Sequence, residues 1–274
     1  MATVTGLFIY PVKSCRGIEV HESRLTERGL QHDREWMIVD AQDRFITQRE
    51  YPRLALIEPT VDAAALVLRA PDRNPLAVPL GPPGDRRTVT VWRYTGPAFD
   101  QGEEAAQWLS SFIGSEVRLV RFDPATRRLC NPEFAGGSGA HTAFSDGYPL
   151  LVIGEASLAD LNRRLEEQGR GVLPMNRFRP NVVVSGIEAY EEDYVDTLHV
   201  GPVRVKLVKP CARCAITTTD QYSGRRGVEP LRTLSTYRMD VRFDGITFGQ
   251  NAIIADGVGQ RLRIGDALDI EWRF

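Results

Sequence analysis

Short runs of β-branched and aromatic residues recur along the whole chain, separated by clusters of turn-forming residues. In the N-terminal half the runs are residues 3–10, 36–40, 55–61, 65–69 and 87–92, and in the C-terminal half they are 150–154, 181–185, 203–208, 216–219 and 268–272. Runs of this kind predict β-strands. Because they are short and closely spaced, the pattern favours a barrel or a mixed β-rich fold.

Two segments predict helices instead. Residues 102–113 carry Glu103 and Glu104 in the first turn, where acidic side chains suit the helix dipole. A second helix is predicted to begin at Ser157 as its N-cap, with Asp160 three positions later and leucines spaced to form one apolar face. Both are expected to be scaffold helices, so the predicted class is mixed α+β, rich in strands and with few helices.

Composition agrees with an ordinary globular enzyme. The chain has 274 residues, of which 42% are apolar and 26% charged, enough for two modest domains or one large one. Its formal net charge is −2, and this balance does not indicate binding to nucleic acid or to a membrane.

The N-terminal residues lack a basic segment followed by an apolar run of about 7–15 residues, so no signal peptide is expected. No stretch approaches the roughly 20 apolar residues of a transmembrane helix. We therefore expect a cytoplasmic protein whose four cysteines are reduced.

A Cys-x-x-Cys pair, Cys211 and Cys214, lies between Lys209 and a cluster of threonines. A structural zinc site would need two more Cys or His ligands, and no second tight pair is present in the sequence. A thioredoxin-like motif should open a helix, whereas residues 216–219 predict a strand. Two further interpretations stay open: two small buried side chains in a β core, and a single thiolate that binds a soft metal within a cofactor.

Three polar clusters favour an anionic ligand over an apolar one. Residues 10–17 interrupt a strand and present a cation, a hydroxyl and free backbone donors, a combination that can hold a phosphate. Arg34 precedes the strand at 36–40, and Arg177 and Arg179 precede the strand at 181–185.

Several motifs occur in order along nearly the whole chain. They are Tyr10-Pro11-Val12-Lys13-Ser14-Cys15-Arg16-Gly17, Asp33-Arg34, Pro52-Arg53-Leu54, residues 102–108, Ser145-Asp146, residues 155–162, Phe178-Arg179-Pro180-Asn181, Cys211-Ala212-Arg213-Cys214 and Phe248-Gly249-Gln250. This ordered set resembles the MOSC-domain proteins with an N-terminal MOSC β-barrel domain. That group includes the mitochondrial amidoxime reducing component and bacterial enzymes that act on hydroxylaminopurines.

The resemblance implies two β-rich parts with a cofactor between them. The first is an N-terminal barrel-like domain, residues 1–122, and the second is a MOSC β-barrel domain, residues 123–274. A Gly-rich stretch at 123–142 is expected to be a mobile connector, which is why the boundary is set near Phe122.

The resemblance also implies a molybdenum cofactor (Mo-molybdopterin), in which one protein cysteine completes the metal sphere. Matching motifs give that role to Cys214, while Cys211 would only pack nearby. The residues implied for the phosphate, the pterin and its pocket are Lys13, Ser14, Arg34, Ser145, Asp146, Arg179, Asn181 and Arg213. Asn251 and Arg177 depart from residues found in some relatives.

The function implied is reduction of N-hydroxylated compounds such as hydroxylamines, amidoximes or hydroxylaminopurines. Asp146 is a candidate proton donor only through the position of its motif. The sequence shows neither a Gly-x-Gly-x-x-Gly motif after a strand nor enough cysteines for an iron–sulfur relay, so electrons are expected from a separate ferredoxin- or flavin-type protein. Two alternatives are a sulfur-carrying protein of molybdenum cofactor metabolism and a non-catalytic carrier of the cofactor.

Overall fold

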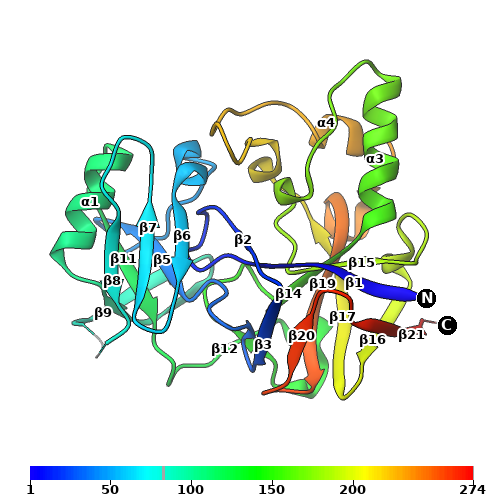
Figure 1. Ribbon diagram of the computed structural model, residues 1–274, viewed down its shortest axis with the longest axis horizontal. Coiled ribbons are helices and arrows are strands. Elements are labelled where there is room, and N and C mark those ends of the chain that lie inside the picture. Colours follow the sequence, from blue (N-terminus) through cyan, green and yellow to red (C-terminus); the bar gives the residue numbers. More distant parts are fainter. Residues whose placement is uncertain (82–83, 274) are drawn as a thin grey trace.

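Seven strands close into a barrel in one lobe of the computed structural model, which describes residues 1–81 and 84–273 (Figure 1). In order around the barrel they are β14 (Leu150–Gly154), β15 (Val182–Ser185), β1 (Ala2–Ile9), β21 (Ala267–Trp272), β16 (Val195–Val200), β17 (Val203–Ala212) and β19 (Gly245–Asp256). Because β19 pairs with both β17 and β14, the barrel has no open edge. The β-rich class with few helices is confirmed.

The first strand of the chain belongs to this barrel, where β1 lies between β15 and β21. Val4 and Leu7 both reach the barrel core although they are three residues apart. A shift in register between Val4 and Gly6 inserts one extra residue and restores the inward alternation. The barrel therefore joins the start of the chain to residues beyond 149, while the predicted domain boundary near Phe122 stays a prediction.

Gly249 permits the contact that closes the barrel. Its φ is +75°, a left-handed conformation that favours glycine. A Cβ at this position would lie 2.6 Å from Ile153 Cγ1 and 2.8 Å from the carbonyl oxygen of Val152, on the neighbouring strand β14. A side chain here would push β14 and β19 apart.

The second lobe contains two smaller sheets and a helix. One sheet has the order β5 (Trp36–Asp40), β11 (Val117–Phe122), β10 (Tyr94–Asp100) and β9 (Arg86–Val91), and the other has the order β6 (Glu58–Val61), β7 (Ala65–Arg69) and β8 (Leu76–Pro79). The first four residues of β5 are apolar because Trp36 and Ile38 pack with α1 (Glu103–Ile113), whereas Met37 and Val39 face a separate core.

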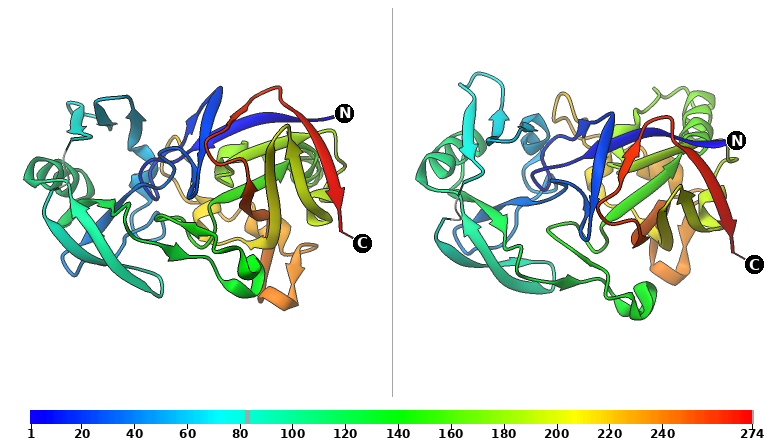
Figure 2. Two further views of the ribbon diagram at one scale, coloured as in Figure 1. Left: turned by 90° about the horizontal axis from the view of Figure 1, so that it is seen from below. Right: turned by 60° about the horizontal axis from the view of Figure 1, so that its bottom comes forward.

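Smaller elements connect the lobes and cover their faces. The short strands are β2 (Ile18–Glu19), β3 (Glu22–Thr26), β4 (Gly29–Leu30), β12 (Arg128–Leu129), β13 (His141–Thr142), β18 (Met239–Asp240) and β20 (Arg261–Arg263). The remaining α-helices are α2 (Pro132–Ala135), α3 (Glu155–Glu167) and α4 (Leu231–Leu234). Figure 2 shows the segment 123–142, in green, running between the lobes. In the part of the chain that the structure describes, no helix is both long and apolar enough to span a bilayer.

Most predicted elements are present, with one helix start corrected and the strand predicted at 55–61 shortened to β6, because Pro52–Leu56 form a 3₁₀ helix. Helix α1 forms where predicted, and β5, β7 and β14 have the predicted bounds. Helix α3 begins at Glu155 with Gly154 as its N-cap, so Ser157 was wrongly predicted as the cap. The Ser157 hydroxyl instead donates to the buried carboxylate of Glu192 at 2.7 Å, inside the core.

Candidate functional site

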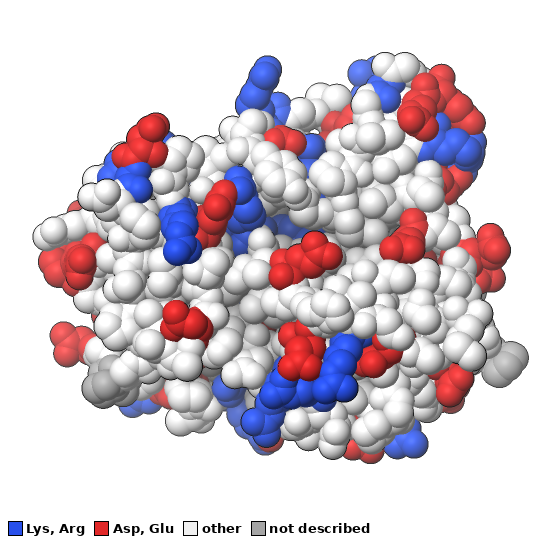
Figure 3. Space-filling view, in the orientation of Figure 1, with Lys and Arg blue, Asp and Glu red and all other residues white. Residues whose placement is uncertain are grey.

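A cavity of about 320 Å³ lies between the lobes, and basic side chains gather in the hollow between them (Figure 3). Every residue predicted for the site lines this cavity: Lys13, Ser14, Arg34, Ser145, Asp146, Arg179, Asn181, Arg213 and Cys214. The first three come from the start of the chain and the others from beyond residue 144. Folding therefore brings the predicted residues together, and their role in holding a cofactor stays a prediction.

The loop after β1 is fixed against β5 by backbone hydrogen bonds. The Lys13 N–H donates to the Trp36 carbonyl at 2.8 Å, and the Trp36 N–H donates to the Pro11 carbonyl at 2.9 Å. Next along the loop, the carbonyl of Ser14 accepts a bond of 2.7 Å from the side-chain amide of Gln48. These bonds hold Lys13 and Ser14 against the cavity.

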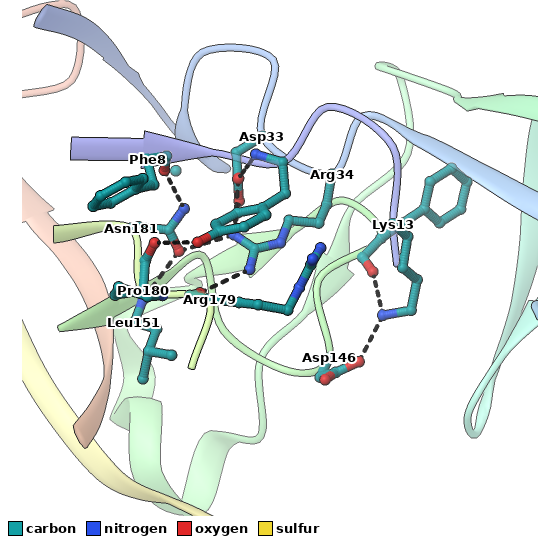
Figure 4. Close-up of polar contacts among 12 residues, drawn as sticks. Phe8, Lys13, Asp33, Arg34, Asp146, Leu151, Arg179, Pro180 and Asn181 are labelled. Atoms are coloured by element: carbon teal, nitrogen blue, oxygen red, sulfur yellow. Dashed lines mark hydrogen bonds and ion pairs between the residues drawn. The ribbon is translucent and has the colours of Figure 1, made fainter. Parts of the chain in front are cut away.

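Lys13 and Asp146 form an ion pair across the cavity. The Lys13 Nζ lies 2.6 Å from Asp146 Oδ1 and also donates to the Phe144 carbonyl at 2.8 Å (Figure 4). Burial lowers the pKa of Lys13, and the neighbouring carboxylate opposes that shift. Enclosure in the cleft alone would raise the pKa of Asp146, but Lys13 and the Trp92 indole N–H outweigh it and hold that pKa below its ordinary value.

The ionised state of Asp146 bears on its suggested role. Its side chain is 70% exposed, so solvent weakens the ion pair with Lys13 but does not reverse the direction of the pKa shift. A carboxyl group with a depressed pKa carries no proton at neutral pH. Asp146 is therefore ionised at neutral pH in this structure, and its suggested role as a proton donor stays a prediction.

Asp33 and Asn181 fix the guanidinium of Arg34. Arg34 Nη1 donates to the two carboxylate oxygens of Asp33 at 2.8 and 2.7 Å and to Asn181 Oδ1 at 3.0 Å (Figure 4). Burial raises the pKa of Asp33, and Arg34 opposes that shift. The Asn181 side chain also accepts from the Leu151 N–H at 3.2 Å and donates to the Phe8 carbonyl at 3.1 Å. The Asn181 amide oxygen thus accepts two hydrogen bonds and one of its N–H groups donates a third, and through the first of these bonds Asn181 positions Arg34.

Two guanidinium groups pack against one tyrosine ring. The Cζ atoms of Arg34 and Arg179 lie 4.1 and 4.2 Å from the centroid of the Tyr10 ring, within the range of cation–π attraction. Burial lowers the pKa of Arg179 to about 10 and raises the pKa of Tyr10 to about 12. Arg179 also donates to the Cys15 carbonyl at 2.7 Å. These contacts hold two cations at one wall of the cavity.

Three of the predicted residues have an uncommon backbone conformation. The φ angles of Ser14, Arg34 and Arg179 are +67°, +48° and +57°. Non-glycine residues seldom adopt positive φ, and such residues cost roughly 1–3 kcal/mol each and cluster at functional sites. This strain at the cavity wall supports a ligand-binding role for that wall.

Arg128 holds the loop that carries Ser145 and Asp146, and sequence reasoning missed it. Its guanidinium donates to the Ala143 carbonyl at 2.9 Å, to the Ser145 carbonyl, and to the Asp146 carbonyl at 2.8 Å. Burial lowers the pKa of Arg128. An arginine in a connector carries no local sequence signal for such a role, because its partners are backbone carbonyls more than a dozen residues away.

A buried glutamine pair joins the lobes and was also missed. The side-chain amides of Gln48 and Gln221 donate to each other at 3.1 and 3.0 Å, and both are essentially inaccessible to solvent. Around them, Arg226 donates to the Gln48 carbonyl at 2.7 Å and Arg16 donates to the Gln221 carbonyl at 3.0 Å. The segment 215–226, which follows Cys214, is thereby tied to the N-terminal lobe.

Immediately after Cys214 the chain forms a 3₁₀ turn, η5 (Ala215–Thr218), so the strand predicted at 216–219 is wrong. The Cys214 carbonyl accepts hydrogen bonds from the backbone N–H and the hydroxyl of Thr217 at 3.1 and 3.0 Å. The Thr217 carbonyl accepts a bond of 2.9 Å from the buried side chain of Arg177. This tertiary contact outweighs the strand preference of the β-branched residues. In this turn Cys214 is exposed and lines the cavity.

Arg213 separates the two cysteines of the pair. One guanidinium nitrogen, Nη1, lies 2.9 Å from Cys211 Sγ, and Nη2 donates to the Phe178 carbonyl at 2.5 Å. Cys211 is thus engaged by a neighbouring cation. Among the described residues, the buried Nε of Arg213 has no hydrogen-bond partner.

The cavity lining suits an anionic group that carries a soft metal. Six cationic side chains face it against one carboxylate, that of Asp146; the six are Lys13, Arg34, Arg49, Arg179, Lys209 and Arg213. Three lining residues have a buried polar atom without a partner among the described residues, namely Ser145 Oγ, Tyr148 Oη and Arg213 Nε. The Cys214 thiol is a soft group of the kind that could ligate such a metal. Within residues 1–81 and 84–273, no group of three or more His, Cys, Asp or Glu side chains is placed to hold a metal ion.

Comparisons with known proteins cover nearly the whole chain. The MOSC N-terminal beta barrel domain matches residues 1–116, and the MOSC domain matches residues 139–269. Mitochondrial amidoxime-reducing component 1 of Homo sapiens is 40% identical over 249 residues, covering 87% of this chain and 72% of that protein. Mitochondrial amidoxime reducing component 2 of Rattus norvegicus is 38% identical over 254 residues, covering 87% and 73%. Molybdenum cofactor sulfurase of Bos taurus is 31% identical over 252 residues, covering 86% of this chain but 29% of that protein.

Proposed function

The chain belongs to the family of MOSC-domain proteins with an N-terminal MOSC β-barrel domain, and on this basis we propose that it is a molybdenum-cofactor-dependent reductase of N-hydroxylated compounds. The names of its amidoxime-reducing relatives support the reaction type. The cofactor, when bound, would supply the redox-active metal for the net reaction, in which the N-hydroxyl compound takes up two electrons and two protons and gives the N–H compound and water.

The observation that carries this proposal is the position of Cys214. Its exposed thiol lines a cavity whose wall is otherwise rich in cations and in buried polar atoms that have no partner among the described residues. A soft metal held by an anionic organic group needs both a thiolate and a cationic cradle.

The residues of the cavity then have separate tasks. Cys214 would ligate the metal, Lys13, Ser14 and Arg34 would face the phosphate and the polar edge of the pterin, and the other predicted residues would line the pterin pocket. Residues that do not themselves line the cavity pre-organise it: Asp33 pairs with Arg34, and Arg128 holds the loop that carries Asp146, the partner of Lys13. Binding therefore requires little rearrangement of charged side chains.

Two measurements on one preparation test the proposal. The purified protein should contain molybdenum, and with a chemical reductant such as reduced viologen it should convert benzamidoxime to benzamidine. Bound metal without turnover of any N-hydroxylated compound would instead favour the carrier alternative. A preparation produced with adequate molybdenum supply that holds neither metal nor pterin would contradict the proposal.

We further propose that electrons arrive from a separate protein. Apart from Cys211 and Cys214, the cysteines of this chain are Cys15 and Cys130, two buried residues whose pKa values burial raises to about 12 and about 11. Such thiols are unsuited to redox relay. NADH alone should therefore not support turnover, whereas NADH with a ferredoxin- or flavin-type reductase system should do so. Rapid substrate-coupled oxidation of NADH by the isolated protein would contradict this electron supply.

A further inference from the structure

Trp92 occupies a strained position at the mouth of the cavity. It is the first residue of the two-residue turn between β9 and β10, and its φ is +56°. Such turn positions usually hold Gly, Asn or Asp, and a bulky residue with positive φ is a clear outlier. The residue is nevertheless 45% exposed, so burial does not explain the presence of a tryptophan there.

Three neighbours hold the indole ring in one orientation. Its Nε1–H donates to Asp146 Oδ1 at 3.0 Å, which ties it to the loop of the barrel lobe. The Cζ atom of Arg49 lies 4.5 Å from the ring centroid, and the Phe45 ring centroid lies 5.0 Å away at an interplanar angle of 53°. Arg49 is itself oriented by a bond of 3.2 Å from its Nε to Thr47 Oγ1. The indole is therefore both accessible and pre-organised.

The ring also lies where the cavity meets a neighbouring groove. Trp92, Arg49 and Asp146 line the predicted cofactor cavity, and they also line a neighbouring open groove of about 1290 Å³. Aromatic residues Tyr51 and Tyr94 lie along that groove. A molecule that reaches Cys214 from the groove passes the face or edge of Trp92.

We propose that Trp92, backed by Arg49, is a stacking platform that selects planar, π-conjugated N-hydroxylated substrates over aliphatic ones. The inference rests on the proposed reductase function and adds a substrate class to it. A fixed indole offers flat rings a large contact area at little entropic cost, because its neighbours have already immobilised it. An aliphatic substrate with the same reacting group gains much less from that surface.

The kinetic test compares benzamidoxime with acetamidoxime, which share the amidoxime group and differ in the ring, using reduced viologen as the electron source. Trp92→Ala should lower kcat/KM for benzamidoxime relative to acetamidoxime by about two- to tenfold, mainly through KM. Trp92→Phe should restore most of the preference, because phenylalanine keeps a flat ring. Trp272→Ala, at a partly exposed tryptophan on β21 that does not line the cavity, should behave like the wild type.

An equal loss for the two substrates, or an unchanged ratio in Trp92→Ala, would overturn the platform while leaving the reductase function intact. A binding measurement keeps the two proposals separable. Without any reductant, benzamidoxime should quench the tryptophan fluorescence of the wild type and of Trp272→Phe in a saturable manner. It should not do so in Trp92→Phe. Retention of the quenching in Trp92→Phe would also overturn the platform, whatever the activity of the enzyme.

Discussion

The ammonium of Lys13 and the carboxylate of Asp146 meet at 2.6 Å although the two residues are 133 positions apart in the chain. This ion pair joins the loop that follows β1 to the loop that precedes β14. It thereby sets one boundary of the cavity, and the indole of Trp92 contacts the same carboxylate oxygen.

Replacing Lys13 by Met should change how stability depends on pH. Lys13 holds the pKa of Asp146 below its ordinary value, so the pair stabilises the fold above the unfolded pKa of about 3.9 and loses that effect as pH falls towards the folded pKa. The stability gap between wild type and Lys13→Met, measured by urea unfolding, should therefore shrink from pH 7 to pH 3. The exposed pair Lys206–Asp196, at 3.5 Å, provides the control variant Lys206→Met, for which the gap should be small at both pH values. A gap for Lys13→Met that stays constant with pH would contradict this role.

Arg34 and Arg213 should respond differently to truncation. Arg34→Ala leaves the buried Asp33 carboxylate without its cation, and loss of such a partner costs about 3–5 kcal/mol of stability even in the cofactor-free protein. Arg213→Ala removes no ion-pair partner of a buried carboxylate, so it should mainly weaken cofactor retention, by roughly 1.5–3 kcal/mol for a charge-assisted bond.

Thermal unfolding of the cofactor-free proteins, together with measured cofactor content, distinguishes the two variants. The double variant Arg34→Ala with Asp33→Asn should recover part of the lost stability, because the orphaned charge is then absent. Normal stability of Arg34→Ala would show that the Asp33 carboxyl is readily rehydrated and that this ion pair does not support the fold.

Gly249→Ala should destabilise the barrel itself. A left-handed residue other than glycine costs about 1–2 kcal/mol. The added methyl would also lie within 2.8 Å of the Val152 carbonyl oxygen, so the total effect should exceed that range. Gly245→Ala is the matched control in the same strand, since the nearest atoms to its Cβ would be 3.6 Å away. Equal midpoints of denaturant unfolding in the two variants would refute the account of how β14 and β19 close the barrel.

Local sequence patterns identified much of the fold because burial on two faces leaves a clear apolar run, as in β5. The prediction of a strand at 216–219 was wrong because the side chain of Arg177, 40 positions earlier, donates a hydrogen bond to the Thr217 carbonyl and stabilises a 3₁₀ turn there. The prediction of Ser157 as an N-cap was wrong for a similar reason, because its hydroxyl donates a hydrogen bond to the buried carboxylate of Glu192. Contacts over such distances leave no local trace in the sequence.

The candidate site was predictable where chemistry and motif coincide, as for Lys13, Arg34 and Cys214, which all line the cavity. The residues that hold these side chains in place could not be predicted from the sequence. Gln48 and Gln221 resemble any polar loop residues until the fold places their amides face to face, and Arg128 acts through backbone carbonyls alone. Closure of the barrel around β1 likewise depends on pairing between the first strand and strands far along the chain.

The central claim is that Cys214 alone provides the protein ligand of the molybdenum. Its most direct test is the molybdenum content and benzamidoxime turnover of Cys214→Ala and Cys211→Ala, purified in parallel. Cys214→Ala should lose turnover to background and much of its bound metal, whereas Cys211→Ala, whose sulfur is engaged by Arg213, should keep most of both. Equal losses in the two variants, or a Cys214→Ala variant with normal metal and turnover, would contradict the assignment.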